Sequence, residues 1–356
     1  MVAAAKEHGL DFIVLSDHNT VSSHKDIPRV GFPIIPGMEL ATFHKPIELG
    51  SGRALYPEEQ YTFGQDDASL YQPGRYRHLL AGGRLIMSQD KNFVSTSGLL
   101  SQNGQRVLIT GAASGIGKAM TLRFADAGAD CLLLDIDAPG LQSMASELQS
   151  KGSRASIAKV DLRSKSQIDA FWAELTDEGL PDVVINNAGV YALKDYLEID
   201  EPFWDTTLSI NLESVFWMCQ NFIKRRLRKG GIIVNVSTIE AILPFKKDLV
   251  AYGTSKAGVI GLTRGLARDY GPYGFRINAI LPGAIKTPST RRLMKMAIQR
   301  FKVDLIKTGY DFQSRLAMGR WGEPDEVARV ALFLASDLAS YVQGAVIPVD
   351  GGFLSS

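Results

Sequence analysis

The chain has 356 residues, 45% of them apolar, which is enough for one large domain and an additional segment. Its 39 basic and 38 acidic side chains leave a formal net charge of +1, so no overall field points to nucleic acid or to a membrane as partner. Two cysteines make no disulfide framework, and no apolar run suits a membrane span or a signal peptide, so we expect a soluble cytoplasmic protein.

Residues 1–100 predict an irregular extension, because Gly, Pro and Ser are frequent and no periodic segment persists. Within this extension, residues 9–40 resemble a fragment of the PHP family of metal-dependent phosphoesterases. Asp17, His18 and Glu39 match positions of hard-metal ligands in that family. Its opening His-x-His is absent and its later Asp-x-His is not found, and a site without most of its ligands should bind metal poorly. We therefore expect no metal site.

A boundary is expected near residue 100. The segments Ser95–Gly98 and Ser101–Gly104 have the composition of a linker, so residues 101–356 are predicted to form the main domain. A chain starting at Met87 would keep every motif of that domain. Residues 1–86 are accordingly expected to be a degenerate fusion remnant or unrelated upstream sequence.

From residue 105 onward, short apolar runs alternate with segments of helical spacing, which predicts repeated βα units and a Rossmann-type doubly wound parallel sheet with helices on both faces. The expected strands are Val107–Thr110, Cys131–Asp135, Ser156–Val160, Val183–Asn186, Ile232–Val236, Arg276–Leu281 and Ala345–Val349. The expected helices are Lys118–Ala127, Ala138–Lys151, Lys165–Glu178, Phe203–Arg228, Ala251–Tyr270 and Pro324–Leu334.

A glycine-rich loop, Gly111–Gly117, follows the first strand and precedes the first helix. In this context glycines allow a tight turn and a close approach of the backbone to a pyrophosphate at the helix N-terminus. Asp135 ends the second strand, where a carboxylate can bind the adenosine ribose hydroxyls and would repel a 2′-phosphate. Because neither Ser114 nor Ile136 is basic, NAD is predicted rather than NADP.

Tyr252 and Lys256 are four residues apart in a predicted helix, so they share one helix face. A lysine there can lower the pKa of the phenol and make it a usable proton carrier. The spacing alone is common, and its significance comes from the nucleotide motif in the same chain.

These motifs, in this order, resemble the short-chain dehydrogenase/reductase family over about residues 105–356. Asn187-Ala188-Gly189, Asn211 and the segment Pro282–Thr287 match further motifs of that family. The resemblance implies that the cofactor is bound by Gly111, Ser114, Gly115, Ile116, Gly117, Asp135, Asp161, Leu162, Asn187, Ala188, Gly189, Tyr252, Lys256, Pro282, Gly283, Ile285 and Thr287. Structural alternatives remain for three of these residues: Asp135 could be an ordinary turn residue at a strand end, Asp161 a turn residue, and Thr287 a turn hydroxyl or helix cap.

The resemblance also implies four catalytic residues: Asn211, Thr238, Tyr252 and Lys256. Tyr252 would be the general acid/base, Lys256 would lower its pKa and bind the nicotinamide ribose, and Asn211 would complete the proton relay. Thr238 aligns with a family serine that holds the substrate oxygen. Ser237 could supply that hydroxyl instead if the loop shifts.

The expected activity is hydride transfer between NAD and a secondary alcohol or ketone, and family members usually form homodimers or homotetramers. Residues 286–320 are expected to cover the substrate; they hold nine Lys or Arg against two Asp, which could favour an anionic substrate. The alternatives are a non-catalytic NAD-binding sensor and a metal-dependent phosphoesterase working through the N-terminal segment.

Overall fold

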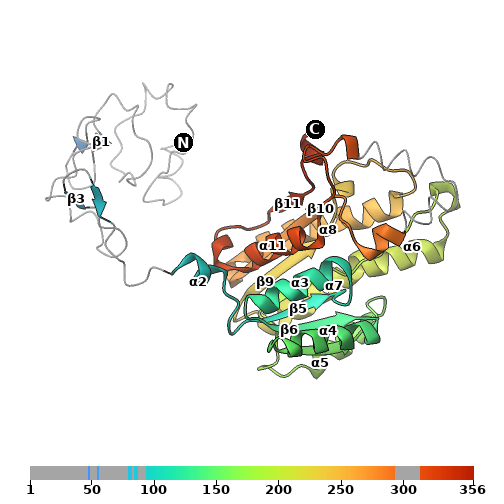
Figure 1. Ribbon diagram of the computed structural model, residues 1–356, viewed down its shortest axis with the longest axis horizontal. Helices are drawn as coiled ribbons and strands as arrows, with labels where there is room; N and C mark the ends of the chain where they lie inside the picture. The colour runs from blue at the N-terminus through green and yellow to red at the C-terminus, as the bar shows by residue number, and fades with distance from the viewer. Residues whose placement is uncertain (1–46, 49–53, 56–78, 82–83, 87–93, 293–312) are drawn as a thin grey trace. The chain divides into compact units, whose positions relative to one another are not determined.

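The computed structural model describes residues 47–48, 54–55, 79–81, 84–86, 94–292 and 313–356 (Figure 1). The chain divides into two compact units, Met1–Phe93 and Val94–Ser356. The first unit contains two short antiparallel pairs, β1 (Ile47–Glu48) with β2 (Ala54–Leu55) and β3 (Leu79–Ala81) with β4 (Arg84–Ile86). Asp17, His18 and Glu39 lie outside the described residues.

The second unit is built on a parallel sheet of seven strands in the order β11-β10-β9-β8-β5-β6-β7 (Figure 1). The chain therefore starts in the middle of the sheet at β5, builds outward to β7, and returns through β8 to build the other half, which confirms the doubly wound prediction. The strands are β5 (Arg106–Thr110), β6 (Asp130–Asp135), β7 (Ala155–Lys159), β8 (Val183–Asn186), β9 (Gly231–Val236), β10 (Phe275–Pro282) and β11 (Val346–Val349).

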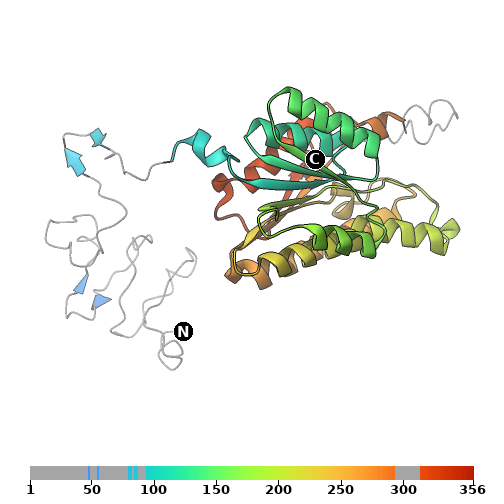
Figure 2. The same ribbon diagram turned by 90° about the horizontal axis from the view of Figure 1, so that it is seen from below.

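Helices cover both faces of this sheet (Figures 1 and 2). One face is covered by α3 (Gly115–Asp126), α4 (Ala138–Ser150) and α11 (Pro324–Ala335). The other is covered by α5 (Lys165–Glu174), α7 (Ser214–Arg226) and α8 (Val250–Tyr270). The C-terminal ends of the strands thus lie along one edge of the sheet, where the loops that follow different strands can meet.

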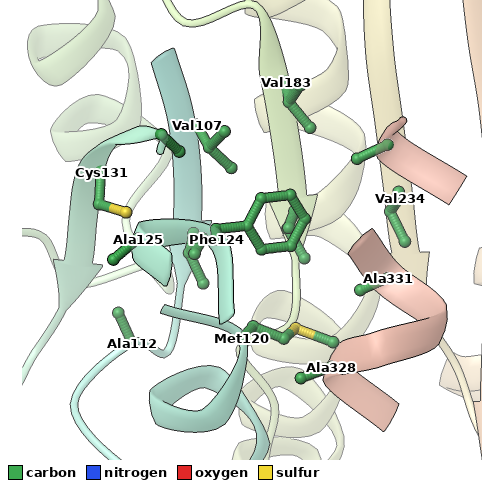
Figure 3. Close-up of a cluster of buried hydrophobic side chains, with 14 of the residues drawn as sticks. Val107, Ala112, Met120, Phe124, Ala125, Cys131, Val183, Val234, Ala328 and Ala331 are labelled. Atoms are coloured by element: carbon green, nitrogen blue, oxygen red, sulfur yellow. The ribbon is translucent and has the colours of Figure 1, made fainter. Parts of the chain in front are cut away.

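The core follows from the alternation of side chains along each strand. In β5, Val107 and Ile109 pack against the α3 face while Leu108 packs against the α5 face. Because both faces are covered, the central strands β5 and β8 carry consecutive buried apolar residues rather than alternating apolar and polar ones. Figure 3 shows the ring of Phe124 from α3 among the side chains of the cluster, with the thioether of Met120 beside Ala328 of α11.

Two elements differ from the sequence prediction. The helix expected over Phe203–Arg228 is divided into α6 (Glu201–Leu208), a π-helical turn Ser209–Glu213, and α7. The expected linker around residue 97 contains a short helix, α2 (Thr96–Leu100), whose N-cap Ser95 accepts a hydrogen bond from the Gly98 amide at 3.1 Å. No helix in the described part of the chain combines the length and apolarity needed to cross a bilayer.

Candidate active site

The glycine loop after β5 is shaped by backbone constraints. Gly111 and Gly115 have φ angles of +66° and +56°, a region that disfavours residues with a Cβ. Gly117 is constrained by space: a Cβ there would lie 2.0 Å from the Gly111 carbonyl oxygen. A Cβ on Gly111 would lie 2.9 Å from the Cα of Ala188, so the loops after β5 and β8 are in close contact. These glycines are required by the fold itself.

The start of α3 is suited to an anionic ligand. Its N-cap residue Ser114 is exposed and makes no side-chain capping hydrogen bond. The first-turn amides are therefore not satisfied by this side chain, and the helix dipole favours negative charge there. A Cβ on Gly115 would be 3.6 Å from Thr287, so the loop after β10 meets the glycine loop at the same place. Ile116, by contrast, packs its side chain on the core.

Asn187 holds the two loops together rather than presenting a free amide. Its Nδ2 donates to the Thr110 and Gly111 carbonyl oxygens at 2.9 Å and 3.3 Å. The backbone amides of Asn187 and Ala188 both donate to the Thr110 hydroxyl at 3.0 Å. Thr110, the last residue of β5, is therefore part of the site's framework. Gly189, next in this loop, is exposed.

Asp135 lies at the end of β6 beside the glycine loop. Its carboxylate accepts hydrogen bonds from the Ala113 amide at 3.0 Å and the Asp137 amide at 3.1 Å. Ile136 next to it is 54% exposed, and neither it nor Ser114 brings a cation to this corner. A carboxylate in this position leaves further lone pairs for hydroxyl donors.

Asp161 and Leu162 have evident structural partners. The Asp161 carboxylate forms an ion pair with Arg163 at 2.6 Å, and hydrogen bonding to Arg163 lowers its pKa. Leu162 packs against the α5 face of the core. The turn interpretation of Asp161 thus has direct structural support, and its side chain would have to share Arg163 with any adenine contact.

The segment Pro282–Thr287 continues from β10 toward the glycine loop. Pro282 ends the strand, and the Gly283 amide donates to the Val349 carbonyl at 3.0 Å. Ile285 is 4% exposed, so only its backbone can face a ligand. The Thr287 hydroxyl accepts from the Thr290 amide at 3.2 Å, which makes it a cap for the following turn, the alternative foreseen from the sequence.

Asn211 is buried in the π-helical turn, and its side chain forms two hydrogen bonds with the backbone of one residue in the loop after β8. Its Oδ1 accepts from the Val190 amide at 2.8 Å and its Nδ2 donates to the Val190 carbonyl at 3.0 Å. A Cβ on Gly189 would lie 3.0 Å from Asn211 Oδ1 and 3.3 Å from Lys256 Nζ. The absence of a side chain at Gly189 therefore leaves room beside both residues.

Lys256 is buried in α8, and its Nζ donates to the Val236 carbonyl oxygen at the end of β9, at 2.9 Å. Removal from water disfavours the ammonium and lowers the pKa of Lys256 to about 8. The side chain is thus anchored on the sheet edge, with its charged end between α8, β9 and Gly189.

The Thr238 hydroxyl lies close enough to the Tyr252 phenol to lower its pKa by hydrogen bonding, which brings together α8 and the loop that follows β9. Burial raises the pKa of Tyr252 to about 12, and the Thr238 hydrogen bond acts in the opposite direction. The chain by itself therefore does not produce the lowered phenol pKa expected from Lys256, because desolvation dominates and the ammonium donates to Val236. Ser237 turns away: its hydroxyl donates to the Lys256 carbonyl at 2.8 Å.

Three residues beside this group were missed from the sequence. The Tyr191 ring packs edge-on against the Tyr252 ring with centroids 4.9 Å apart, and Lys246 Nζ lies over Tyr191 at 5.4 Å. Glu240 is 3% exposed, and burial raises its pKa to about 7. The acidic residue in the otherwise apolar segment after Thr238 was the available signal for Glu240; Tyr191 and Lys246 had none.

The expected covering segment 286–320 lies largely outside the described residues, which omit 293–312. Two of its nine cations have partners just beyond the segment, since Lys286 pairs with Glu323 at 2.6 Å and Arg320 with Glu326 at 2.7 Å. Its local positive excess is therefore smaller than the sequence count implies.

No group of three or more His, Cys, Asp or Glu residues that could hold a metal ion occurs in the described parts of the chain. The fold and the loops at its edge instead define the class of nucleotide-binding α/β oxidoreductases. Residues 111–354 match the family described as "Enoyl-(Acyl carrier protein) reductase". The chain belongs to the short-chain dehydrogenase/reductase family.

Relatives of this chain include enzymes that act on different compounds. It is 37% identical to 3-oxoacyl-[acyl-carrier-protein] reductase FabG of Thermotoga maritima, over 70% of this chain and 98% of that protein. It is 36% identical to 2-keto-3-deoxy-L-fuconate dehydrogenase of Xanthomonas campestris, over 70% of this chain and 80% of that protein. A crystal structure from Beutenbergia cavernae, provisionally described as an NAD(P)-dependent gluconate 5-dehydrogenase with bound NADP, is 33% identical with a TM-score of 0.67, covering 73% of this chain and all of that one.

Proposed function

We propose that this oxidoreductase transfers hydride between a secondary alcohol or its ketone and NAD, with Tyr252 as general acid/base. The observation that carries the proposal is the convergence of four side chains from three parts of the chain at one sheet edge, beside the glycine loop. The π-helical turn contributes Asn211, the loop after β9 contributes Thr238, and α8 contributes both Tyr252 and Lys256.

The site fits a nicotinamide dinucleotide. The α3 N-terminus without a side-chain cap and the glycine turn at Gly111 would hold the pyrophosphate, and Asp135 the adenosine ribose. Thr287, close to Gly115, and Lys256, beside Gly189, would flank the nicotinamide end. When bound, the cofactor supplies the hydride acceptor or donor at its nicotinamide ring.

The chain's own residues handle the proton. Tyr252 would exchange a proton with the substrate oxygen, and Thr238 would donate a hydrogen bond to the same oxygen as charge develops on it. Ser237 is a poor candidate for this task because its hydroxyl is used by the Lys256 carbonyl. Lys256 and Asn211, with Gly189 between them, would pass the proton toward solvent and stabilise the Tyr252 phenolate electrostatically.

NAD is proposed over NADP because Asp135 would repel a 2′-phosphate and no cation accompanies it at Ser114 or Ile136. The NADP bound in the Beutenbergia cavernae structure argues against this preference. Two of the relatives named above act on a 3-oxoacyl-[acyl-carrier-protein] and on 2-keto-3-deoxy-L-fuconate, so they leave the substrate of this chain open.

Replacement of Tyr252 by Phe tests the proposal and separates it from a non-catalytic NAD sensor. The phenyl ring keeps the packing on Tyr191 but has no proton to exchange, so we expect kcat/KM to fall by at least about 10²-fold while NADH still binds. NADH absorbance across a panel of secondary alcohols gives the rates, and NADH fluorescence gives the binding. Retained turnover in this variant would rule out Tyr252 as the proton carrier, and absence of turnover in the wild type would favour the sensor.

A further inference from the structure

The loop between Thr238 and α8 brings one cation close to the proposed proton carrier. Lys246 Nζ lies 5.4 Å from the ring centre of Tyr191, and this ring packs on that of Tyr252 at 4.9 Å. The ammonium is thus one aromatic ring away from Tyr252. In a substrate that places one group at the Lys246 ammonium and its reacting carbon beside the Tyr252 phenol, that group and that carbon would be several bonds apart.

This cation has no ion-pair partner among the residues that the structure describes. Glu240 and Asp248 act on it only through space, and burial lowers the pKa of Lys246, which means that its ammonium is partly removed from water. An ammonium that has lost part of its hydration without gaining a carboxylate is suited to receive an anionic ligand.

Glu240 fixes the loop that carries Lys246 instead of pairing with its ammonium. Its carboxylate accepts hydrogen bonds from the backbone amides of Phe245 and Lys246, and its Oε2 is buried without a hydrogen-bond partner. Asp248 closes the loop with a φ of 68°, an uncommon conformation for a residue other than glycine, and its carbonyl oxygen accepts from the Lys194 amide at 3.0 Å. The loop is therefore held in place from both ends.

We propose that Lys246 determines specificity by binding a negatively charged group of the substrate, a carboxylate or a phosphate placed several bonds from the reacting carbon. Polyhydroxy acids and sugar alcohol phosphates have this chemistry. The inference rests on the proposed hydride transfer at Tyr252. The neighbouring Lys247 is exposed and is the matched control.

The test compares Lys246→Gln with Lys247→Gln and the wild type in the full-length protein. The probes share one hydroxylated chain: D-gluconate with a carboxylate, D-glucitol 6-phosphate with a phosphate, and neutral D-glucitol. We expect Lys246→Gln to lower kcat/KM by about tenfold or more on the two anionic probes. On neutral D-glucitol the kcat/KM of Lys246→Gln should stay within about twofold of wild type, and Lys247→Gln should stay within about twofold on every probe. The probe that loses more identifies the anion.

A second measurement does not need turnover. Binding of D-gluconate and of D-glucitol 6-phosphate to the protein–NADH complex is followed by NADH fluorescence, and Lys246→Gln should weaken it while Lys246→Arg restores it. Equal losses on charged and neutral probes, no loss on any probe, or no binding of either anion would overturn the inference. If the protein oxidises neutral alcohols and Lys246→Gln changes neither rate nor binding, the inference is wrong and the proposed reaction stands. If anions bind in a way that depends on Lys246 but no alcohol is oxidised, the proposed reaction is wrong and the anion site at Lys246 stands.

Discussion

Replacing Lys256 by Met should abolish activity and change how stability depends on pH. The lysine is buried, and its pKa falls from 10.5 to about 8 in the fold. A group with a lowered basic pKa binds fewer protons in the folded state than in the unfolded state between these two values. The wild type should therefore gain stability as pH rises from about 8 to 10.5 and lose that gain as pH falls back through about 8.

The magnitude follows from the two pKa values. With about 1.4 kcal/mol for each unit of pKa difference, the buried ammonium destabilises the fold by roughly 3 kcal/mol at pH 7 relative to pH above 10.5. Met has a similar shape but no proton, so this term disappears in the variant. The variant also loses the hydrogen bond of 2.9 Å to the Val236 carbonyl oxygen, and leaving that buried oxygen without a donor costs about 1–3 kcal/mol. This cost offsets part of the stability gained by removing the buried ammonium.

The hydrogen-bond term is present at every pH and cancels when the stability difference is compared between two pH values. Urea unfolding of wild type and Lys256→Met, without cofactor, at several pH values between 7 and 10 measures this change directly. We expect the variant to be as stable as or more stable than the wild type at pH 7. The free energy of unfolding of the variant minus that of the wild type should then fall by about 2–3 kcal/mol between pH 7 and pH 10. A constant difference across this range would show that the Lys256 ammonium is not destabilised by burial.

Two further variants test roles within the same site. Thr238→Ala should lower kcat by about 10²-fold or more by removing a donor to the developing oxyanion, and Thr238→Ser should restore most of the rate. Ser237→Ala should keep most activity but destabilise the fold by about 1 kcal/mol, because it removes the hydrogen bond to the Lys256 carbonyl. The opposite pattern would assign the hydroxyl to Ser237. Asp135→Ser combined with Ile136→Arg should reverse the ratio of kcat/KM for NAD and NADP by removing the repulsion and adding a cation. An unchanged ratio would mean that Asp135 does not set the cofactor preference.

Features that depend on local geometry could be predicted from the sequence. The glycine loop, its flanking strand and helix, and the i, i+4 relation of Tyr252 and Lys256 involve short stretches of chain, where spacing and residue type fix the conformation. The parallel sheet followed from alternating apolar strands and helical segments. The family resemblance over residues 105–356 rested on these same stretches, and the match over 111–354 confirmed it.

Other features depended on contacts between residues far apart in the sequence. No local pattern says that Asn211 lies in a π-helical turn and holds Val190, or that Ser237 turns toward α8 while Thr238 meets Tyr252. The raised pKa of Tyr252 likewise comes from burial, which is a property of the assembled core rather than of the Tyr-Lys spacing.

The sequence by itself therefore determined the fold and the types of residue at its active edge, because strand pattern, turn chemistry and helix spacing are local. Only the tertiary structure decided which hydroxyl meets the phenol, which carbonyl anchors Lys256, and which cation lies over Tyr191. Those choices depend on how separate loops meet at the C-terminal ends of the strands, where distance in the sequence gives no measure of distance in space.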